Sequence, residues 1–177
     1  MNMKKLQIIL GLVALVFTSS CIKNDQAVFD SDTVLEFDAA SWNANGAGVA
    51  YPILTRIPGY GRPVIATGAT PDPVLSRNNP GVKKFRVNLV GRQSETPIKA
   101  FYTVFAGTTA VADVHYRMSG ELTIPAKSSF GEMEVEILNP GAPATPGPRD
   151  LNIILTGGER GIKSSANYRV IALRIAQ

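Results

Sequence analysis

From Thr33 onward the chain alternates apolar and polar residues with a period of two, and this pattern predicts half-buried β-strands. The clearest case is residues 83–90, where Phe85, Val87 and Leu89 fall on one face and polar side chains fall on the other. Because successive side chains of a strand point to opposite faces of its sheet, we expect these three residues in a core.

Residues 132–138 repeat the alternation, with Met133, Val135 and Ile137 predicted inside and the three glutamates between them predicted outside. The glutamates would share one face of the strand, but no other ligand converges on them, and a row of like charges needs solvent. We therefore expect a solvated strand face here and not a metal site.

Five further strands are predicted at residues 34–37, 98–105, 116–124, 151–155 and 168–175. The last is apolar on nearly both faces, so we expect it to be covered on both sides. No long window has a helical stripe. About seven short strands with turn residues between them predict an all-β fold, a single immunoglobulin-like Greek-key β-sandwich over residues 33–177. A length of 177 residues with 45% hydrophobic and 18% charged residues fits one globular domain.

Two proline-rich segments interrupt the strands. Residues 51–81 hold six of the 12 prolines and therefore cannot form a central strand. A loop of this length is either functional or partly disordered. Residues 139–148 are rich in proline, glycine and alanine, and predict a stiff, solvated connection between two strands.

Residues 1–20 have the pattern of a secretory signal peptide. Lys4 and Lys5 precede an apolar run over residues 6–17, which is shorter than the roughly 20 residues that a membrane-spanning helix needs. Small residues then lead to Cys21, the only cysteine, and this arrangement resembles the lipobox of bacterial lipoprotein signals. The resemblance implies that Cys21 becomes the lipidated N-terminus, with residues 21–32 as a polar tether.

The charge balance argues against a nucleic-acid partner. The formal net charge of +4 includes Lys4 and Lys5 of the signal, which leaves +2 for the rest of the chain, where basic residues are scattered among acidic ones. The polar, acidic stretch after Cys21 resembles the surface-export signal of Bacteroidota-type lipoproteins. We therefore expect a protein of the cell envelope that is lipid-anchored to the outer membrane at the cell surface.

Residues 108–116, 120–126 and 131–137 contain strand-and-turn motifs in which a Thr-Ala segment leads to a tyrosine and a strand ends in an Ile-Pro-Ala turn. These motifs resemble the core of Calx-beta-like sandwich domains. Residues 35–43, 51–56 and 87–93 resemble uncharacterised lipoprotein domains encoded beside starch-utilisation-type outer-membrane glycan-uptake systems. The resemblances imply a β-sandwich whose partners are a glycan or the outer-membrane uptake components.

Calcium-binding Calx-beta domains carry clustered acidic loop residues, one of them directly before the tyrosine of the middle motif. Here that position is His115, Asp113 lies nearby, and Asp150 stands alone after a proline-rich loop that has no carboxylate. Ca²⁺ takes about six to eight oxygen ligands, which these loops do not offer. We expect no metal and no cofactor.

One histidine and one cysteine leave little for catalysis. His115 and Asp113 can be drawn with a nearby serine as a triad, but the chain has no Gly-x-Ser-x-Gly elbow to hold the nucleophile. The acidic residues at strand ends share no motif for glycoside hydrolysis. The glycine-rich residues 157–161 lack the ending of a phosphate loop and predict a hairpin loop between the last two strands. We expect no catalytic residue, and a protein that is not an enzyme.

Aromatic residues in polar surroundings are the candidate ligand-binding groups. Trp42, the only tryptophan, lies in a context of small and polar residues in which a large ring is not a routine core residue. Aromatic faces beside amide and guanidinium groups suit sugar rings. The alternative is that Trp42 folds over the end of the sandwich as a lid on the core. The candidate residues are Trp42, Asn43, Tyr51, Arg56, Tyr60 and Arg62.

These features together predict a non-enzymatic, lipid-anchored binding or accessory module of the cell envelope that is linked to glycan capture or uptake. The alternative is a structural or adhesion protein that contacts another envelope protein and has no small ligand.

Overall fold

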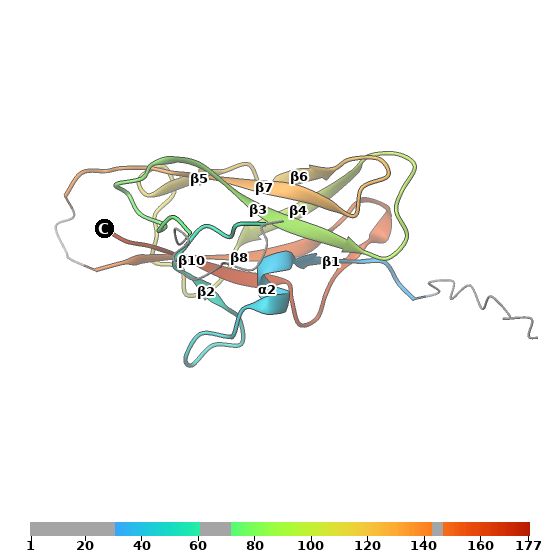
Figure 1. The fold of residues 1–177 in the computed structure, drawn as a ribbon, viewed down its shortest axis with the longest axis horizontal. Coiled ribbons are helices and arrows are strands. Elements are labelled where there is room, and N and C mark those ends of the chain that lie inside the picture. The colour runs from blue at the N-terminus through green and yellow to red at the C-terminus, as the bar shows by residue number, and fades with distance from the viewer. Residues whose placement is uncertain (1–30, 61–71, 143–146) are drawn as a thin grey trace, which may run out of the picture.

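The computed structural model describes residues 31–60, 72–142 and 147–177, and these residues form two five-stranded sheets packed face to face (Figure 1). The first sheet has the order β5-β7-β3-β1-β9 and the second the order β2-β10-β8-β4-β6. The strands of the first sheet are β1 (Val34–Phe37), β3 (Gly81–Val90), β5 (Tyr116–Met118), β7 (Phe130–Ile137) and β9 (Lys163–Ser164). Those of the second are β2 (Ile53–Leu54), β4 (Ile98–Val104), β6 (Glu121–Ile124), β8 (Arg149–Gly158) and β10 (Val170–Ile175). A short helix α2 (Asp38–Trp42) follows β1, and a 3₁₀ turn η1 (Glu159–Gly161) follows β8.

Consecutive strands never lie in the same sheet, because every odd-numbered strand belongs to the first sheet and every even-numbered strand to the second. Each connection therefore crosses between the two layers. The neighbours within each sheet are distant in sequence and run antiparallel, except for the short parallel pairs β1 with β9 and β2 with β10. The predicted all-β sandwich is confirmed.

The ten strands exceed the predicted seven for identifiable reasons. The expected strand over residues 116–124 breaks at Ser119 and Gly120, where Gly120 has a φ of +85°, and its halves β5 and β6 enter different sheets. Strands β2 and β9 contain two residues each, which is too short for an alternating pattern to mark them.

The core lies between the sheets, and the predicted alternation places its residues correctly. Phe85 and Val87 of β3 and Met133 and Val135 of β7 are fully buried. Each buried side chain of this size contributes about 1.5–3 kcal/mol to the free energy of unfolding. The same holds for the inward residues Leu151, Ile153 and Leu155 of β8, which were also predicted.

The glutamates of β7 face outward, as expected, and cations on the neighbouring strands separate them. Lys84 Nζ lies 2.7 Å from a carboxylate oxygen of Glu132 and 3.5 Å from one of Glu134. Arg117 lies 3.7 Å from Glu136. These pairs are exposed, so each contributes little to stability, but they relieve the repulsion along the row of carboxylates.

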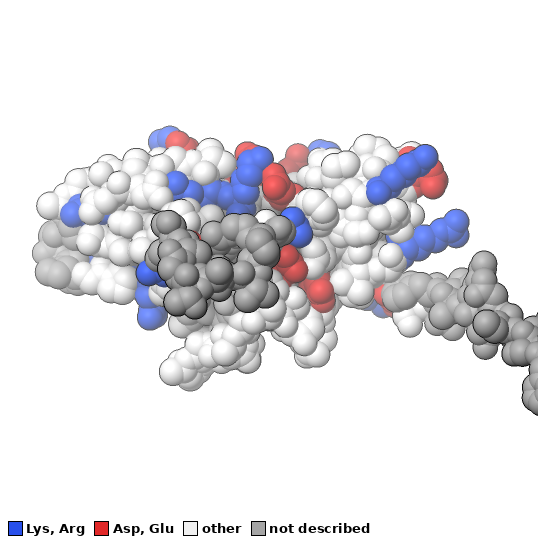
Figure 2. All heavy atoms as spheres, in the orientation of Figure 1, with Lys and Arg blue, Asp and Glu red and all other residues white. Residues whose placement is uncertain are grey.

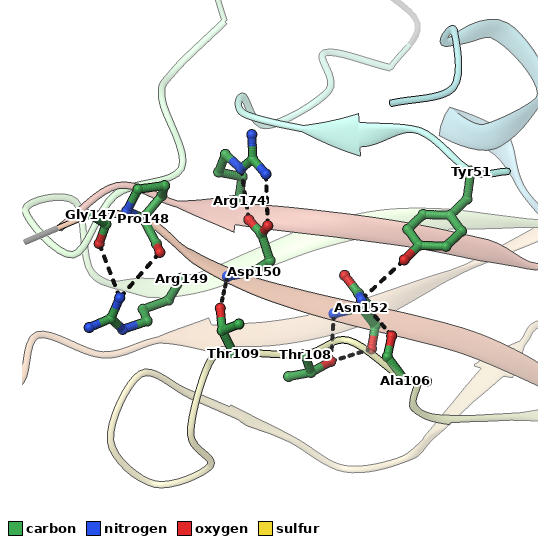
Figure 3. A network of polar contacts seen from close by, with 10 residues as sticks. All are labelled: Tyr51, Ala106, Thr108, Thr109, Gly147, Pro148, Arg149, Asp150, Asn152 and Arg174. Carbon is green, nitrogen blue, oxygen red and sulfur yellow. Dashed lines mark hydrogen bonds and ion pairs between the residues drawn. The ribbon is translucent and has the colours of Figure 1, made fainter. Parts of the chain in front are cut away.

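Strand β10 is covered on both faces, which confirms the prediction from its sequence. On the outer face of the second sheet, Ala172 of β10 is paired with Asn152 of β8, and both are buried. Asn152 Nδ2 donates hydrogen bonds to the carbonyl oxygen of Ala106 (2.7 Å) and to the hydroxyl of Tyr51 (3.2 Å) (Figure 3). The Tyr51 ring packs edge-on against Phe105, with 6.0 Å between ring centroids. Tyr51 therefore closes over the outer face of the sheet.

The proline-rich segment over residues 51–81 is ordered at both ends. The N–H of Ile57 donates to the carbonyl oxygen of Pro73, and the N–H of Leu75 donates to that of Thr55, each at 2.9 Å. Leu75 is fully buried, so this short antiparallel contact is attached to the core. Between β2 and the start of β3, the described residues of the segment form no long strand, and β2 itself lies at the edge of its sheet, which agrees with the prolines.

The predicted hairpin loop after β8 also contributes a strand to the first sheet. Strands β8 and β10 are antiparallel neighbours, so the loop does join them, but on its way it also supplies β9 to the first sheet. In Figure 1 this loop lies at the same end of the sandwich as the start of β1. Lys163 of β9 lies 3.3 Å from Asp32, just before β1.

The predicted signal peptide, Cys21 and most of the tether lie outside the described residues. No helix in the described parts of the chain is long and apolar enough to cross a membrane. The boundaries at residues 1–20, 21–32 and 33–177 stay predictions.

Candidate functional site

A hollow of about 210 Å³ lies between the end of α2 and the strand β2. Sites for drug-sized ligands are larger, roughly 300–1,000 Å³, so this hollow has room for one ring of a larger ligand. It is lined by Trp42, Asn43, Ile53, Leu54, Thr55, Arg56, Pro58 and Asp72.

Helix α2 is a single turn that presents Trp42 to solvent. Its alanines Ala39 and Ala40 are buried, because small side chains let the helix lie close to the sandwich. At the other end Trp42 is 57% exposed. Whether Trp42 contacts a ligand or folds over the end of the sandwich as a lid on the core stays a prediction.

Asn43 ends the helix and fixes the position of Trp42. Its backbone N–H and its side-chain Nδ2 both donate to the carbonyl oxygen of Ala39, at 3.1 and 2.8 Å. These bonds satisfy the carbonyl oxygen of Ala39, which has no hydrogen-bond partner inside so short a helix. The side-chain oxygen of Asn43 accepts no hydrogen bond from the described residues, so it remains available as an acceptor.

Arg56, which follows β2, also lines the hollow. Residue 56 pairs with Val74 in an isolated antiparallel bridge. The Arg56 guanidinium donates a hydrogen bond to the backbone carbonyl oxygen of Asp72. This contact holds the guanidinium at the rim, and a guanidinium has five N–H donors, so donors remain for a ligand.

The structure thus brings together three of the predicted site residues, Trp42, Asn43 and Arg56. Arg62 lies outside the described residues. Thr55 and Asp72 also line this hollow and were not predicted from the sequence. No local pattern marks them, because the hollow forms only when residues 55–57 pair with residues 73–75.

The two predicted tyrosines lie apart from this hollow. Tyr51 packs against Phe105 and accepts a hydrogen bond from Asn152. Tyr60 lies over the outer face of β3, where its ring centroid is 4.8 Å from the Arg86 guanidinium. This arrangement does not test whether either tyrosine contacts a ligand, so ligand binding by Tyr51 and Tyr60 stays a prediction.

Arg86 is held between two aromatic rings, since the centroid of Phe130 lies 4.2 Å from its guanidinium and Tyr60 lies on it as well. Burial raises the pKa of the Tyr60 hydroxyl to about 12. The nearby carboxyl of Glu36 also has a raised pKa, again mainly because of burial. The contact between Tyr60 and Arg86 attaches the proline-rich segment to the first sheet.

His115 has a structural position. It is buried, and its Nδ1 accepts a hydrogen bond of 2.9 Å from the backbone N–H of Val111. A nitrogen that accepts is unprotonated, so this contact places the ring proton of the neutral form on Nε2. The Asp113 carboxylate accepts a hydrogen bond of 2.9 Å from Arg117 Nε, and not one from the His115 imidazole. His115 closes the loop before β5.

Charged side chains are mixed on the face shown in Figure 2, where basic and acidic groups stand beside one another. Within residues 31–60, 72–142 and 147–177, no three His, Cys, Asp or Glu side chains lie close enough together to hold a metal ion.

No protein-family model matches the chain and no curated protein is similar to it at a significant level. Several solved structures are similar to parts of it, including the following three. The CBD12 domains of CALX1.2 are 19% identical with a TM-score of 0.43, over 54% of this chain and 37% of that one. The apo form of the Calx CBD1 domain is 19% identical with a TM-score of 0.42, over 55% of this chain and 84% of that one. A candidate carbohydrate-binding protein from Bacteroides ovatus is 10% identical with a TM-score of 0.41, over 55% of this chain and 32% of that one.

Calx domains, which the sequence motifs resemble, are thus among the solved structures to which this chain is similar. The matches span about a third of the CALX1.2 and Bacteroides ovatus chains. At these identities and TM-scores the likeness assigns neither a ligand nor a site to the present protein.

Proposed function

We propose that this protein is a binding module that takes a glycan at the hollow between α2 and β2. The observation that carries the proposal is the convergence of Trp42, Asn43 and Arg56 on one hollow, with the indole 57% exposed. Trp42 and Asn43 are adjacent at the end of α2, whereas Arg56 follows β2, and the sequence alone does not place Arg56 beside them.

The geometry suits a sugar ring for chemical reasons. The apolar face of a pyranose packs on an exposed indole, while its hydroxyl groups need donors and acceptors around the edge. Asn43 supplies an amide oxygen that accepts no hydrogen bond from the described residues, and Arg56 supplies N–H donors to the same hollow. The volume of about 210 Å³ fits one ring, so we expect the module to contact a single residue of a longer glycan at this position.

The proposal includes the cellular location predicted from the sequence. Lipidation at Cys21 would hold the domain on the outer membrane, where a glycan from outside the cell arrives first. The support for this location is the signal pattern of residues 1–20 and the single cysteine directly after it. Two or three acyl chains would make the attachment nearly permanent.

The test is affinity electrophoresis of the purified protein through gels that contain single polysaccharides, with Trp42→Ala beside the wild type. We expect at least one polysaccharide to retard the wild type and about a tenfold loss of affinity in the variant, since the aromatic contact supplies much of the binding.

Tyr168→Ala is the matched control, because Tyr168 is also an exposed aromatic residue and its hydrogen bonds to the described residues are made by its backbone, whose carbonyl accepts from the N–H of Phe37 and whose N–H donates to the Ser165 hydroxyl. Equal losses in the two variants, or no retardation of the folded protein by a broad panel, would refute the glycan site. The second outcome would favour a protein partner and crosslinking on intact cells.

A further inference from the structure

A second hollow, separate from the one at Trp42, lies on the outer face of the second sheet. Its volume is about 510 Å³, more than twice that of the first. None of its lining residues belongs to the hollow between α2 and β2. It is lined by Phe101, Thr156, Gly157, Gly158, Gly161, Ile162, Lys163, Ser164 and Arg169.

Phe101 of β4 supplies an aromatic surface in this hollow. It points away from the core, is 37% exposed, and is paired across the sheet with Gly157 of β8. A glycine is required there, because its φ is +124° and a Cβ would come within 2.9 Å of the carbonyl oxygen of Ile162. Gly157 has no side chain and is the cross-strand partner of Phe101, so it leaves one side of the Phe101 ring uncovered.

The groups around the ring are cationic and hydroxylic. Lys163 and Arg169 both belong to the lining, and no carboxylate does. Lys163 forms one weak ion pair, with Asp32 at 3.3 Å, in which both side chains are more than three-quarters exposed. The Arg169 side chain is exposed and forms no ion pair with any residue that the structure describes. Thr156 and Ser164 add hydroxyl groups.

We propose that this hollow binds a sugar ring that carries a carboxylate or sulfate group, as part of an acidic polysaccharide. The ring would pack on Phe101, and the anionic group would pair with Arg169 and Lys163, since charge-assisted hydrogen bonds are the strong ones. A bare inorganic anion makes no use of the aromatic surface.

The surroundings disfavour a densely charged polyphosphate such as a nucleic acid. Glu121 is paired with Phe101 across the sheet on the side of β6, and Glu159 follows Gly158. These two carboxylates add negative charge near the cationic hollow, although Lys99 lies 3.1 Å from Glu121, so a densely charged chain is accommodated less well than an isolated anionic group.

The test measures binding of the purified protein to three polymers: a highly methyl-esterified pectin, whose free carboxylates are widely spaced, κ-carrageenan, which carries one sulfate on every second sugar, and neutral dextran. We expect one or both acidic polymers to bind and neutral dextran not to bind at this site. Arg169→Gln should weaken that binding about tenfold, and Phe101→Ala about fivefold. Salt near 1 M, where the Debye length is about 3 Å, should also weaken it. Whichever of the two polymers binds identifies the anionic group.

The matched control is Lys127→Gln. Lys127 is as exposed as Lys163 and forms an equivalent ion pair, with Glu95 at 3.4 Å, but it does not line the hollow. An equal loss in Lys127→Gln and Arg169→Gln, tighter binding of a single-stranded oligonucleotide, or no binding of either acidic polymer would overturn the proposal.

Trp42→Ala separates this site from the proposed function, because that variant should keep its affinity for the acidic polymer. If Phe101→Ala proves unstable, Arg169→Gln still decides the question. The backbone carbonyl of Arg169, which accepts from the N–H of Leu155, is unchanged by that substitution.

Discussion

Asn152→Ala tests whether Tyr51 is a structural clamp over the second sheet. The substitution removes two hydrogen bonds, of 2.7 Å to the Ala106 carbonyl and 3.2 Å to the Tyr51 hydroxyl (Figure 3). The amide is buried, with 4% exposure, so the bonds form in a water-poor site. The bond network around Thr108, whose hydroxyl accepts from the backbone N–H of Asn152 at 3.0 Å, does not depend on the Asn152 side chain.

The magnitude follows from these contacts. Each hydrogen bond contributes about 0.5–1.5 kcal/mol net, so two of them give a loss of roughly 1–3 kcal/mol in the free energy of unfolding. For a chain of 177 residues this corresponds to a fall in Tm of about 2–4 °C for each kcal/mol. Tyr51→Phe removes only the weaker bond, so we expect it to cost about 0.5–1.5 kcal/mol.

Urea unfolding followed by circular dichroism, on the wild type, both single variants and the double variant, measures the coupling between the two side chains. We expect the losses in the single variants to sum to more than the loss in the double variant, since the shared bond is then counted only once. A neutral Tyr51→Phe together with additive losses would show that the Tyr51 hydroxyl does not hold the sheet, and would refute this reasoning.

Three further predictions concern single positions. Gly131→Ala should destabilise the protein by about 1–3 kcal/mol in the same unfolding assay, because the new Cβ would meet the carbonyl oxygen of Thr123 at 2.7 Å; a neutral result would mean that β6 moves away without cost. Burial raises the pKa of Tyr60 to about 12, so its contribution to the free energy of unfolding, roughly 2–3 kcal/mol, is complete below pH 10 and is lost as the pH rises through 12. Tyr60→Phe should therefore lose less stability than the wild type between pH 10 and pH 12. An unchanged dependence of stability on pH would contradict the burial of the Tyr60 hydroxyl. Cys21→Ala should abolish incorporation of labelled fatty acid in cells and move the protein out of the detergent phase, and continued labelling would place the lipid elsewhere.

Strands could be predicted from the sequence where they are long and have one face in the core and the other in solvent, because such strands show an alternating pattern. Phe85 and Met133 lie in such strands, and their burial follows from the pattern alone. Strands β2 and β9 could not be predicted, since two residues carry no period and their pairing comes from parallel neighbours elsewhere in the chain. The five-residue helix α2 is likewise shorter than any window in which a helical stripe can be recognised.

The candidate site was predictable in its residue types and not in its geometry. Trp42 and Asn43 stand out because a large ring lies among small polar residues. The position of Arg56 beside them depends on its contact with the backbone of Asp72, 16 residues further along the chain. Ligand binding by Tyr51 stays a prediction, and its hydrogen bond with Asn152 could not be predicted, because the two residues lie 101 positions apart and no local pattern records their contact.

The most direct test of the central claim uses the fact that the chain has a single tryptophan. Any change in tryptophan emission on adding a glycan therefore reports on Trp42, which lines the hollow. We predict that the polysaccharide that retards the protein in a gel also changes this emission, saturably, with the same apparent Kd. Saturable binding of that polysaccharide with no change in the emission of Trp42 would contradict the account and place the glycan elsewhere on the protein.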